Sequence, residues 1–149
     1  MEIIELQGAS LLYIADFLSD EQADKLFEKL LHYERWMQDH IKMFGKDILQ
    51  PRLTALFSDN NNEYTYSGLT MHPEIFPSYM TRIKERCEEI CEQSFNACLA
   101  NLYRDGQDSM GWHADDEKEL GTNPVIASVS IGEPRIFHLK HRKDKNLTY

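Results

Sequence analysis

A histidine and an aspartate two positions apart, His113 and Asp115, are the residues best suited to chemistry in this sequence. On an extended segment or a tight turn, an imidazole and a carboxylate at this spacing can converge on one metal ion. With a second, distant histidine they form the facial triad of non-haem iron oxygenases, which leaves coordination positions open for a bidentate 2-oxo acid and for O₂. Alone, the His-x-Asp pair is a weak signal, because surface loops often combine histidine with acidic residues.

The residues that precede this pair strengthen the signal. Residues 95–103 alternate as in a strand, which puts Asn101 and Tyr103 on one face. An Asp-Gly turn follows and leads the chain toward His113. The amide and the phenol could therefore donate hydrogen bonds to a carboxylate that lies beside the metal.

The combined pattern resembles the signature of the AlkB family, which runs N-x-Y, a glycine-containing turn, and then H-x-D-D/K-E/D. Here the segments 101–103 and 113–117 carry it, and residues 128–137 continue it without gaps. Upstream, Pro51-Arg52 and Tyr64–Gly68 are similar to the family's lid over the target base. Met43-Phe44-Gly45-Lys46 is similar to the apolar finger of the subgroup that prefers double strands, so the resemblance covers residues from about 10 to 145.

The resemblance implies a role for each matched residue. His113 and Asp115 would be ligands of Fe(II), and Asn101 and Tyr103 would bind 2-oxoglutarate. The residues implied to bind the substrate are Phe44, Gly45, Lys46, Arg52, Tyr64, Tyr66, Asp116 and Glu117.

A structural role stays open for several of the substrate-side residues. Tyr66 would stack on a flipped base and Tyr64 would hydrogen-bond it, yet paired tyrosines are also ordinary strand residues. Phe44 would enter the base stack as a wedge, or it would close over the core. Asp116 and Glu117 would accept from an exocyclic amine or attract a cationic base, or they would form an acidic turn.

The activity that the resemblance implies is oxidative demethylation of alkylated bases in DNA, such as 1-methyladenine and 3-methylcytosine, with Fe(II), O₂ and 2-oxoglutarate. Because the alkylated atom faces the partner strand, the base must be flipped out or already single-stranded. Two alternatives remain: a 2-oxoglutarate oxygenase that acts on RNA or protein, and a catalytically incomplete remnant that binds nucleic acid without turnover.

The sequence ends at Tyr149, before the place where the family carries its second metal-binding histidine and the arginines that anchor 2-oxoglutarate. His138 and His141 do not lie at the matching position, so we interpret them as strand residues. We therefore expect an incomplete C-terminus and favour a fragment over a partner that supplies the rest or a non-catalytic descendant. Missing strands would leave sheet edges exposed, through which chains could associate.

The elements that must position these residues follow from local patterns. Ser19, with Gln22 three residues later, predicts a capped helix, and Pro77 begins a second one. A loop is expected around Phe44-Gly45-Lys46, and strand patterns lie at 3–14, 53–57, 64–66, 95–103, 124–131 and 135–141. Together they predict a single α+β domain over residues 1–149, a double-stranded β-helix (jelly-roll-like) with helices packed on one sheet and its C-terminal strands missing.

Composition restricts the class of protein further. The net charge of −9 disfavours a nucleic-acid partner, although Arg52 and a basic segment at 135–145 could contact phosphates if they are not simply solvated. The three cysteines lack zinc-site spacing and predict buried free thiols in a reducing compartment. No apolar run is long enough to span a bilayer and the N-terminus is acidic, so we expect a cytoplasmic or nuclear protein with no membrane partner.

Overall fold

The computed structural model describes residues 1–149 except 44, 61–63, 67–68 and 117–119. The chain divides into two compact units, one formed by residues 1–32 with 129–149 and the other by residues 33–128. Each unit is described separately. In the described part of the chain, no helix is long and apolar enough to cross a membrane.

The first unit begins with a β-hairpin and a helix. β1 (Glu2–Leu6) pairs antiparallel with β2 (Ala9–Tyr13) around Gly8, so the strand pattern predicted at residues 3–14 forms a hairpin. α1 (Asp20–Leu31) has Ser19 as its N-cap, and the reciprocal hydrogen bonds between Ser19 and Gln22 confirm the predicted capping box.

The prediction of strands at 124–131 and 135–141 is wrong, because the described residues there form no strand. In this region an isolated bridge joins Lys140 to Thr148. An alternating pattern becomes a strand only when a neighbouring segment accepts and donates the ladder hydrogen bonds. The described chain supplies no such neighbour for these residues.

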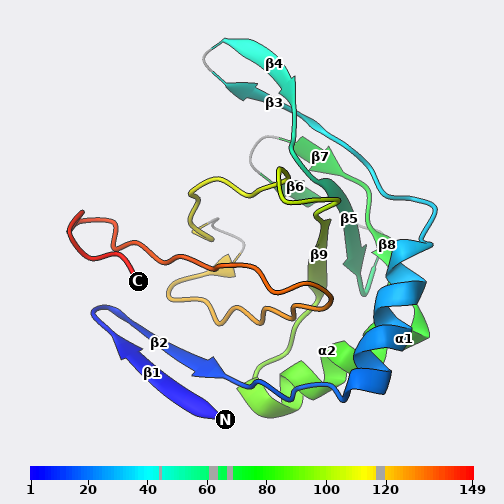
Figure 1. Cartoon of the computed structure of the whole chain (residues 1–149), viewed down its shortest axis with the longest axis horizontal. Coiled ribbons are helices and arrows are strands. Elements are labelled where there is room, and N and C mark those ends of the chain that lie inside the picture. Colours follow the sequence, from blue (N-terminus) through cyan, green and yellow to red (C-terminus); the bar gives the residue numbers. More distant parts are fainter. Residues whose placement is uncertain (44, 61–63, 67–68, 117–119) are drawn as a thin grey trace. The chain divides into compact units, whose positions relative to one another are not determined.

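The second unit is built around the three-stranded sheet β8-β5-β9 (Figure 1). The central strand β5 (Leu53–Ser58) is antiparallel to β9 (Ala97–Leu102) and parallel to the short β8 (Glu74–Ile75). These strands confirm the patterns at 53–57 and 95–103. The core centres on Phe57, which is 1% exposed and contacts the rings of Tyr33 and Phe76.

The helix predicted after Pro77 is confirmed as α2 (Ser78–Cys91), with Met80 and Cys87 buried. The helix ends at Glu92, which has a left-handed backbone with φ of 50°. All three cysteines are free thiols, as predicted, but of the three only Cys87 is buried, and Cys91 and Cys98 are half-buried. Burial raises the pKa of Cys98, on β9, to about 11.

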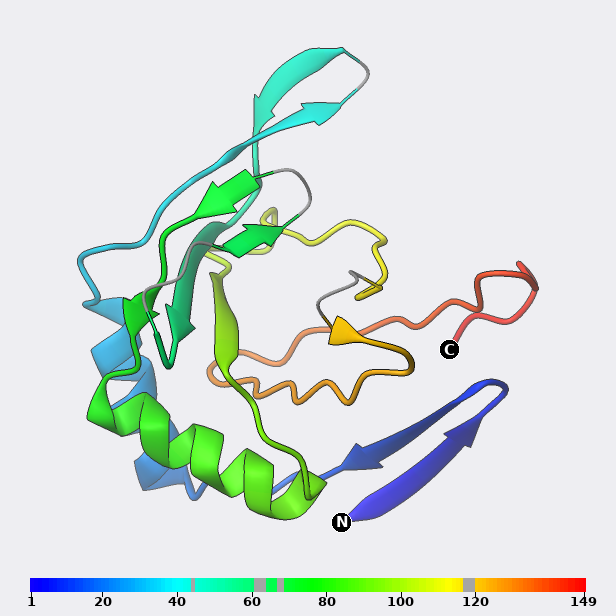
Figure 2. The same cartoon turned by 180° about the vertical axis from the view of Figure 1, so that it is seen from behind.

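Two further hairpins complete the second unit. β6 (Tyr64–Tyr66), predicted as a strand, pairs with β7 (Leu69–Met71). The loop expected around Phe44-Gly45-Lys46 is instead a hairpin, in which β3 (His40–Met43) pairs with β4 (Lys46–Leu49) and Gly45 supplies a positive φ of 76°. In Figures 1 and 2 this hairpin extends away from the sheet, at the end of the unit opposite α2. The chain therefore mixes helices with several small sheets.

Candidate active site

The pairing of β5 with β9 creates a polar patch on one face of the sheet. Thr54 lies directly opposite Asn101, and directly opposed residues share a face of an antiparallel pair. Arg52, two residues before Thr54, is on the same side, and its Nε donates to Asn101 Oδ1 over 2.8 Å. Thr54 Oγ1 donates to Asp39 Oδ2 over 3.0 Å. Arg52 and Thr54 are both buried, so this polar patch is held by its own hydrogen bonds.

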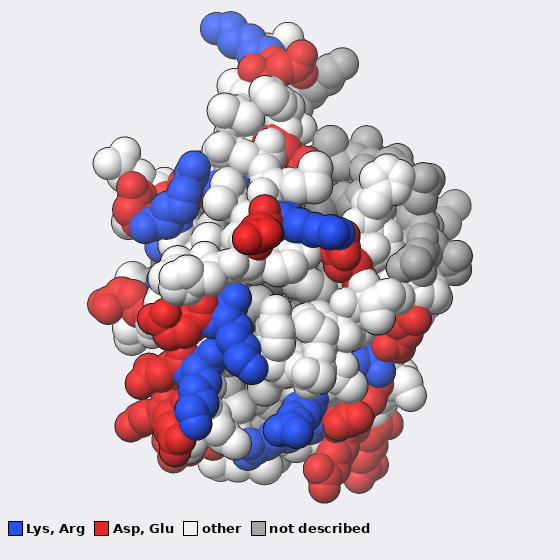
Figure 3. All heavy atoms as spheres, turned by 90° about the vertical axis from the view of Figure 1, so that its right-hand side faces the viewer, with Lys and Arg blue, Asp and Glu red and all other residues white. Residues whose placement is uncertain are grey.

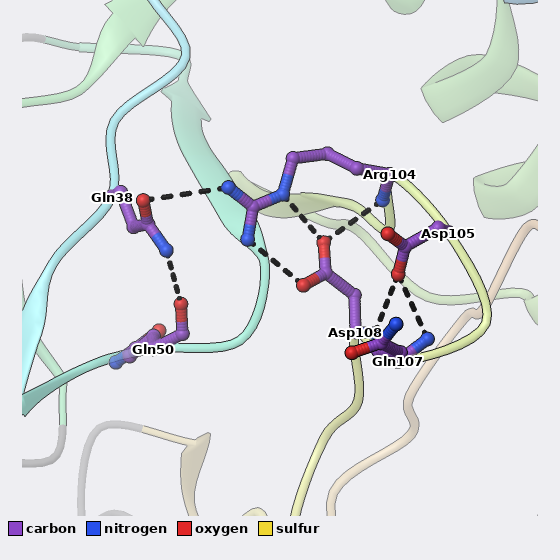
Figure 4. A network of polar contacts seen from close by, with 6 residues as sticks. All are labelled: Gln38, Gln50, Arg104, Asp105, Gln107 and Asp108. Atoms are coloured by element: carbon purple, nitrogen blue, oxygen red, sulfur yellow. Dashed lines mark hydrogen bonds and ion pairs between the residues drawn. The ribbon is translucent and has the colours of Figure 1, made fainter.

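After β9, an ion pair closes the turn that leads toward His113 (Figure 4). The Arg104 guanidinium donates to both carboxylate oxygens of Asp108, over 2.7 and 2.8 Å, and the Arg104 backbone N–H donates to the same carboxylate over 2.9 Å. Asp108 is 5% exposed. These hydrogen bonds raise the pKa of Arg104. Within the turn, Asp105 Oδ1 accepts from the backbone N–H groups of Gln107 and Asp108.

Hydrogen bonds join the turn at residues 104–109 to residues 50–51, which lie between β4 and β5. Gln38 accepts from Arg104 over 3.5 Å and donates to the Gln50 carbonyl over 2.7 Å, as Figure 4 shows. The Ser109 N–H donates to the Pro51 carbonyl over 2.8 Å. Because Arg52 follows Pro51 directly, one set of hydrogen bonds positions both the polar patch and the start of the His113 segment.

The structure brings His113 and Asp115 together. The His113 Nε2 atom lies 3.6 Å from Asp115 Oδ1, and both side chains are partly exposed. The other ring nitrogen, Nδ1, lies 3.0 Å from the Gly111 carbonyl oxygen. A carbonyl can only accept, so Nδ1 carries a proton, which leaves Nε2 as the ring nitrogen that would bind a metal in place of a proton. Metal-binding histidines show this arrangement, in which a carbonyl fixes the tautomer.

This geometry fits a shared metal ion. Two ligand atoms that each lie about 2.1 Å from one ion are roughly 3 to 4 Å apart, and the 3.6 Å separation falls within that span. Among the described residues, no third histidine, cysteine or acidic side chain joins the pair. The pair therefore provides two ligands on one side of an ion and leaves its other positions open.

The remaining predicted residues lie on several elements. Asp116 follows Asp115 and is exposed, and Tyr103 is half-buried just after β9. Lys46 begins β4 and is exposed, whereas Gly45 turns the hairpin. Tyr64 and Tyr66 are the two ends of β6, and Phe44 and Glu117 lie outside the described residues.

Sequence reasoning missed several residues that support the site. Thr54 could have been found from the pattern of residues 52–58, in which Arg52 and Thr54 put polar groups at alternate positions of an apolar strand. Arg104 and Asp108 are four residues apart and flank an Asp-Gly turn, a weak signal for an ion pair. Gln38 and Asp39 carry no local signal, because only the fold brings them to these partners.

Charged side chains give no uniformly basic surface on the face shown in Figure 3, where small basic and acidic groups are interspersed. Apart from this view, some basic side chains of the chain are paired with carboxylates. Lys84 lies 3.3 Å from Asp59 and 3.1 Å from Glu88. This face therefore does not resemble a phosphate-binding surface.

Comparison with known proteins now gives the class of protein to which this fold and site belong. Residues 10–148 match the 2OG-Fe(II) oxygenase superfamily, so the chain belongs to that family, whose cofactors are Fe(II) and 2-oxoglutarate. The resemblance drawn from the Asn-x-Tyr and His-x-Asp motifs is confirmed.

Within this family, the chain is similar to several curated proteins of the AlkB type. The chain is 36% identical over 145 residues to "DNA oxidative demethylase ALKBH2" of Mus musculus, covering 95% of this chain and 60% of that one. It is 37% identical over 127 residues to the ALKBH2 protein of Bos taurus, covering 83% and 46% of the two chains. It is 41% identical over 131 residues to "Alpha-ketoglutarate-dependent dioxygenase alkB homolog 3" of Rattus norvegicus, covering 85% and 42%. The chain spans about half the length of the curated relatives it matches.

Proposed function

We propose that this protein is a dioxygenase that demethylates alkylated bases in DNA, such as 1-methyladenine and 3-methylcytosine, with Fe(II), O₂ and 2-oxoglutarate. The observation that carries the proposal is the His113–Asp115 pair, in which the His113 Nε2 atom lies 3.6 Å from the Asp115 Oδ1 atom. The hydrogen bond between Nδ1 and the Gly111 carbonyl supports the tautomer that a metal requires. The relatives named as DNA oxidative demethylases support DNA as the substrate.

Each half of the site has its own task in this proposal. His113 and Asp115 hold the iron, and Asn101 and Tyr103 donate hydrogen bonds to 2-oxoglutarate. When bound, iron and 2-oxoglutarate supply the oxidising chemistry that hydroxylates the alkyl carbon, after which the base and an aldehyde separate. Membership of the 2OG-Fe(II) oxygenase superfamily supports a jelly-roll fold around the site, to which the antiparallel pair β5 and β9 would belong.

The substrate side is proposed from the hairpins and from the segment after the metal pair. The residues are Phe44, Gly45, Lys46, Tyr64, Tyr66, Asp116 and Glu117. Arg52, which the sequence also suggested for this role, is 6% exposed and is hydrogen-bonded to Asn101. The β3–β4 hairpin extends from its unit, a form suited to reaching a base stack, and aromatic side chains stack on any base. A nucleic-acid substrate fits the cytoplasmic or nuclear location that we expect, and RNA remains an alternative substrate.

The test is turnover with a histidine variant. We expect the protein to release succinate and formaldehyde from an oligonucleotide that contains 1-methyladenine, only when Fe(II) is present. His113→Ala removes a ligand and should lower both products at least 100-fold, consistent with loss of a metal ligand. His32→Ala, which changes an exposed histidine on the first unit, is the matched control.

Three outcomes decide between the alternatives. Equal product release from the His113→Ala protein would remove the metal assignment. Turnover of a methylated RNA or of a peptide, without turnover of DNA, would show that the substrate is RNA or protein and not DNA. If the unaltered protein binds the oligonucleotide but releases no succinate, it is a catalytically incomplete protein that binds nucleic acid without turnover.

A further inference from the structure

Arg52 is a buried cation that is hydrogen-bonded to a residue of the proposed cofactor site. It lies just before β5 and is 6% exposed. Its Nε donates to Asn101 Oδ1 over 2.8 Å. Arginine is almost never buried unless it is paired, so this hydrogen bond accounts for its position better than a role on the surface does. A phosphate contact would instead require the guanidinium to reach solvent.

This hydrogen bond decides the orientation of the Asn101 carboxamide. A guanidinium has only donors, so the atom facing Arg52 must be the oxygen of the amide. The NH₂ group, Nδ2, then points away from Arg52. This Nδ2 atom lies 3.5 Å from the Leu99 carbonyl oxygen, at the limit of hydrogen-bonding distance.

The backbone on both sides of the amide is fixed by the sheet. Asn101 is opposite Thr54 in the β5–β9 register, and Thr54 is itself held by Asp39. Arg52 is anchored by the hydrogen bond between the Pro51 carbonyl and the Ser109 N–H. The carboxamide is therefore held between two fixed strands, with rotation about its last bond restrained by Arg52.

We propose that Arg52 is a positioning residue that turns the Asn101 NH₂ group toward a carboxylate of 2-oxoglutarate. This inference rests on the proposed function. Without Arg52 the amide could rotate by half a turn and present its oxygen to the carboxylate, where two acceptors repel. The role differs from the phosphate contact that the sequence suggested for Arg52, and it acts on the cofactor and not on the nucleic acid.

The test is direct binding, measured by calorimetric titration of 2-oxoglutarate into the protein with Mn(II) as a redox-inert metal. Arg52→Met keeps the length of the side chain but removes its donors, and should weaken 2-oxoglutarate binding about 10-fold or more, as expected for a charge-assisted hydrogen bond. In an Asn101→Ala background the same change should have no effect. Arg82→Met alters an exposed arginine on α2 and is the matched control.

A measurement on the unaltered protein guards against a variant that fails to fold. The side-chain NH₂ signals of Asn101 in a ¹⁵N-correlated NMR spectrum should shift when 2-oxoglutarate is added. Unmoved signals in a protein that binds the acid would overturn the proposal. Arg52→Lys, which retains the positive charge and a donor, serves where Arg52→Met is unfolded and should recover part of the affinity.

The two proposals fail in different ways. If the unaltered protein does not bind 2-oxoglutarate, the proposed function falls and this inference falls with it. If it binds and Arg52→Met binds equally well, only the positioning role is lost. If Arg52→Met instead weakens DNA binding and reduces its salt dependence, Arg52 contacts phosphate.

Discussion

At the scale of single residues, the site depends on hydrogen bonds that fix the direction of polar groups. The Gly111 carbonyl sets the tautomer of His113, and Arg52 sets the amide of Asn101. In both cases a group that can only accept or only donate removes an ambiguity in its neighbour. The Asp108 carboxylate, which can only accept, orients Arg104 in the same way. It accepts from the Arg104 backbone N–H and from two nitrogens of its guanidinium group.

The Asp108→Asn variant measures what this carboxylate contributes. The amide that replaces it has one acceptor instead of two and adds a donor facing the guanidinium. Because the Arg104 side chain is 44% exposed, solvent screens part of the loss. We expect a decrease of about 1 to 3 kcal/mol in the free energy of unfolding. Urea titration followed by tryptophan fluorescence measures it, with exposed Asp47→Asn as the control. Identical midpoints for the two variants would show that the ion pair is not stabilising.

At the scale of elements, α2 is joined to the sheet through Glu88. Its carboxylate accepts from the Phe95 backbone N–H over 2.8 Å, where the chain leaves the helix for β9, and it pairs with Lys84. The Phe95 hydrogen bond, followed by Lys84, lowers the pKa of Glu88 below its ordinary value. The hydrogen bond that joins α2 to the segment before β9 therefore involves an ionised carboxylate, and its strength depends on pH.

The direction of this dependence follows from the lowered pKa. The stabilising effect of Glu88 is complete above the carboxyl's ordinary pKa of 4.5 and is lost as the pH falls through its lower value in the folded protein. Glu88→Gln should therefore flatten the decline in stability below that pH. Unfolding in urea at a series of acidic pH values measures the slope, with Glu85→Gln, exposed on the same helix, as the control. Parallel slopes for Glu88→Gln and the unaltered protein would contradict the assignment.

At the scale of the whole molecule, exposed apolar groups and sheet edges suit association with other chains. Ile136 and Phe137 are adjacent and are 85% and 71% exposed. In the sheet of the second unit, β8 and β9 are the outer strands among the described residues. Both features are typical of surfaces that another segment covers.

We expect the protein to associate as its concentration rises, and the double variant Ile136→Lys/Phe137→Lys to weaken that association about 10-fold, because it replaces adjacent apolar side chains with charges. Sedimentation velocity over a range of concentrations measures the effect. Met37→Lys, at an apolar residue of the second unit whose side chain is 60% exposed, is the control. Unchanged association in the double variant would point to the β9 edge instead.

Local patterns by themselves determined the capped helix at Ser19, the helix after Pro77, the strands of β5, β6 and β9, and the motif that identifies the family. These features depend on neighbours within a few positions along the chain, so the sequence contains them. Only the tertiary structure decided that residues 40–49 form a hairpin and that residues 124–141 lack strands in their described part. It alone also buried Arg52 against Asn101. Each of these outcomes depends on which distant groups supply hydrogen bonds, and no local pattern specifies them.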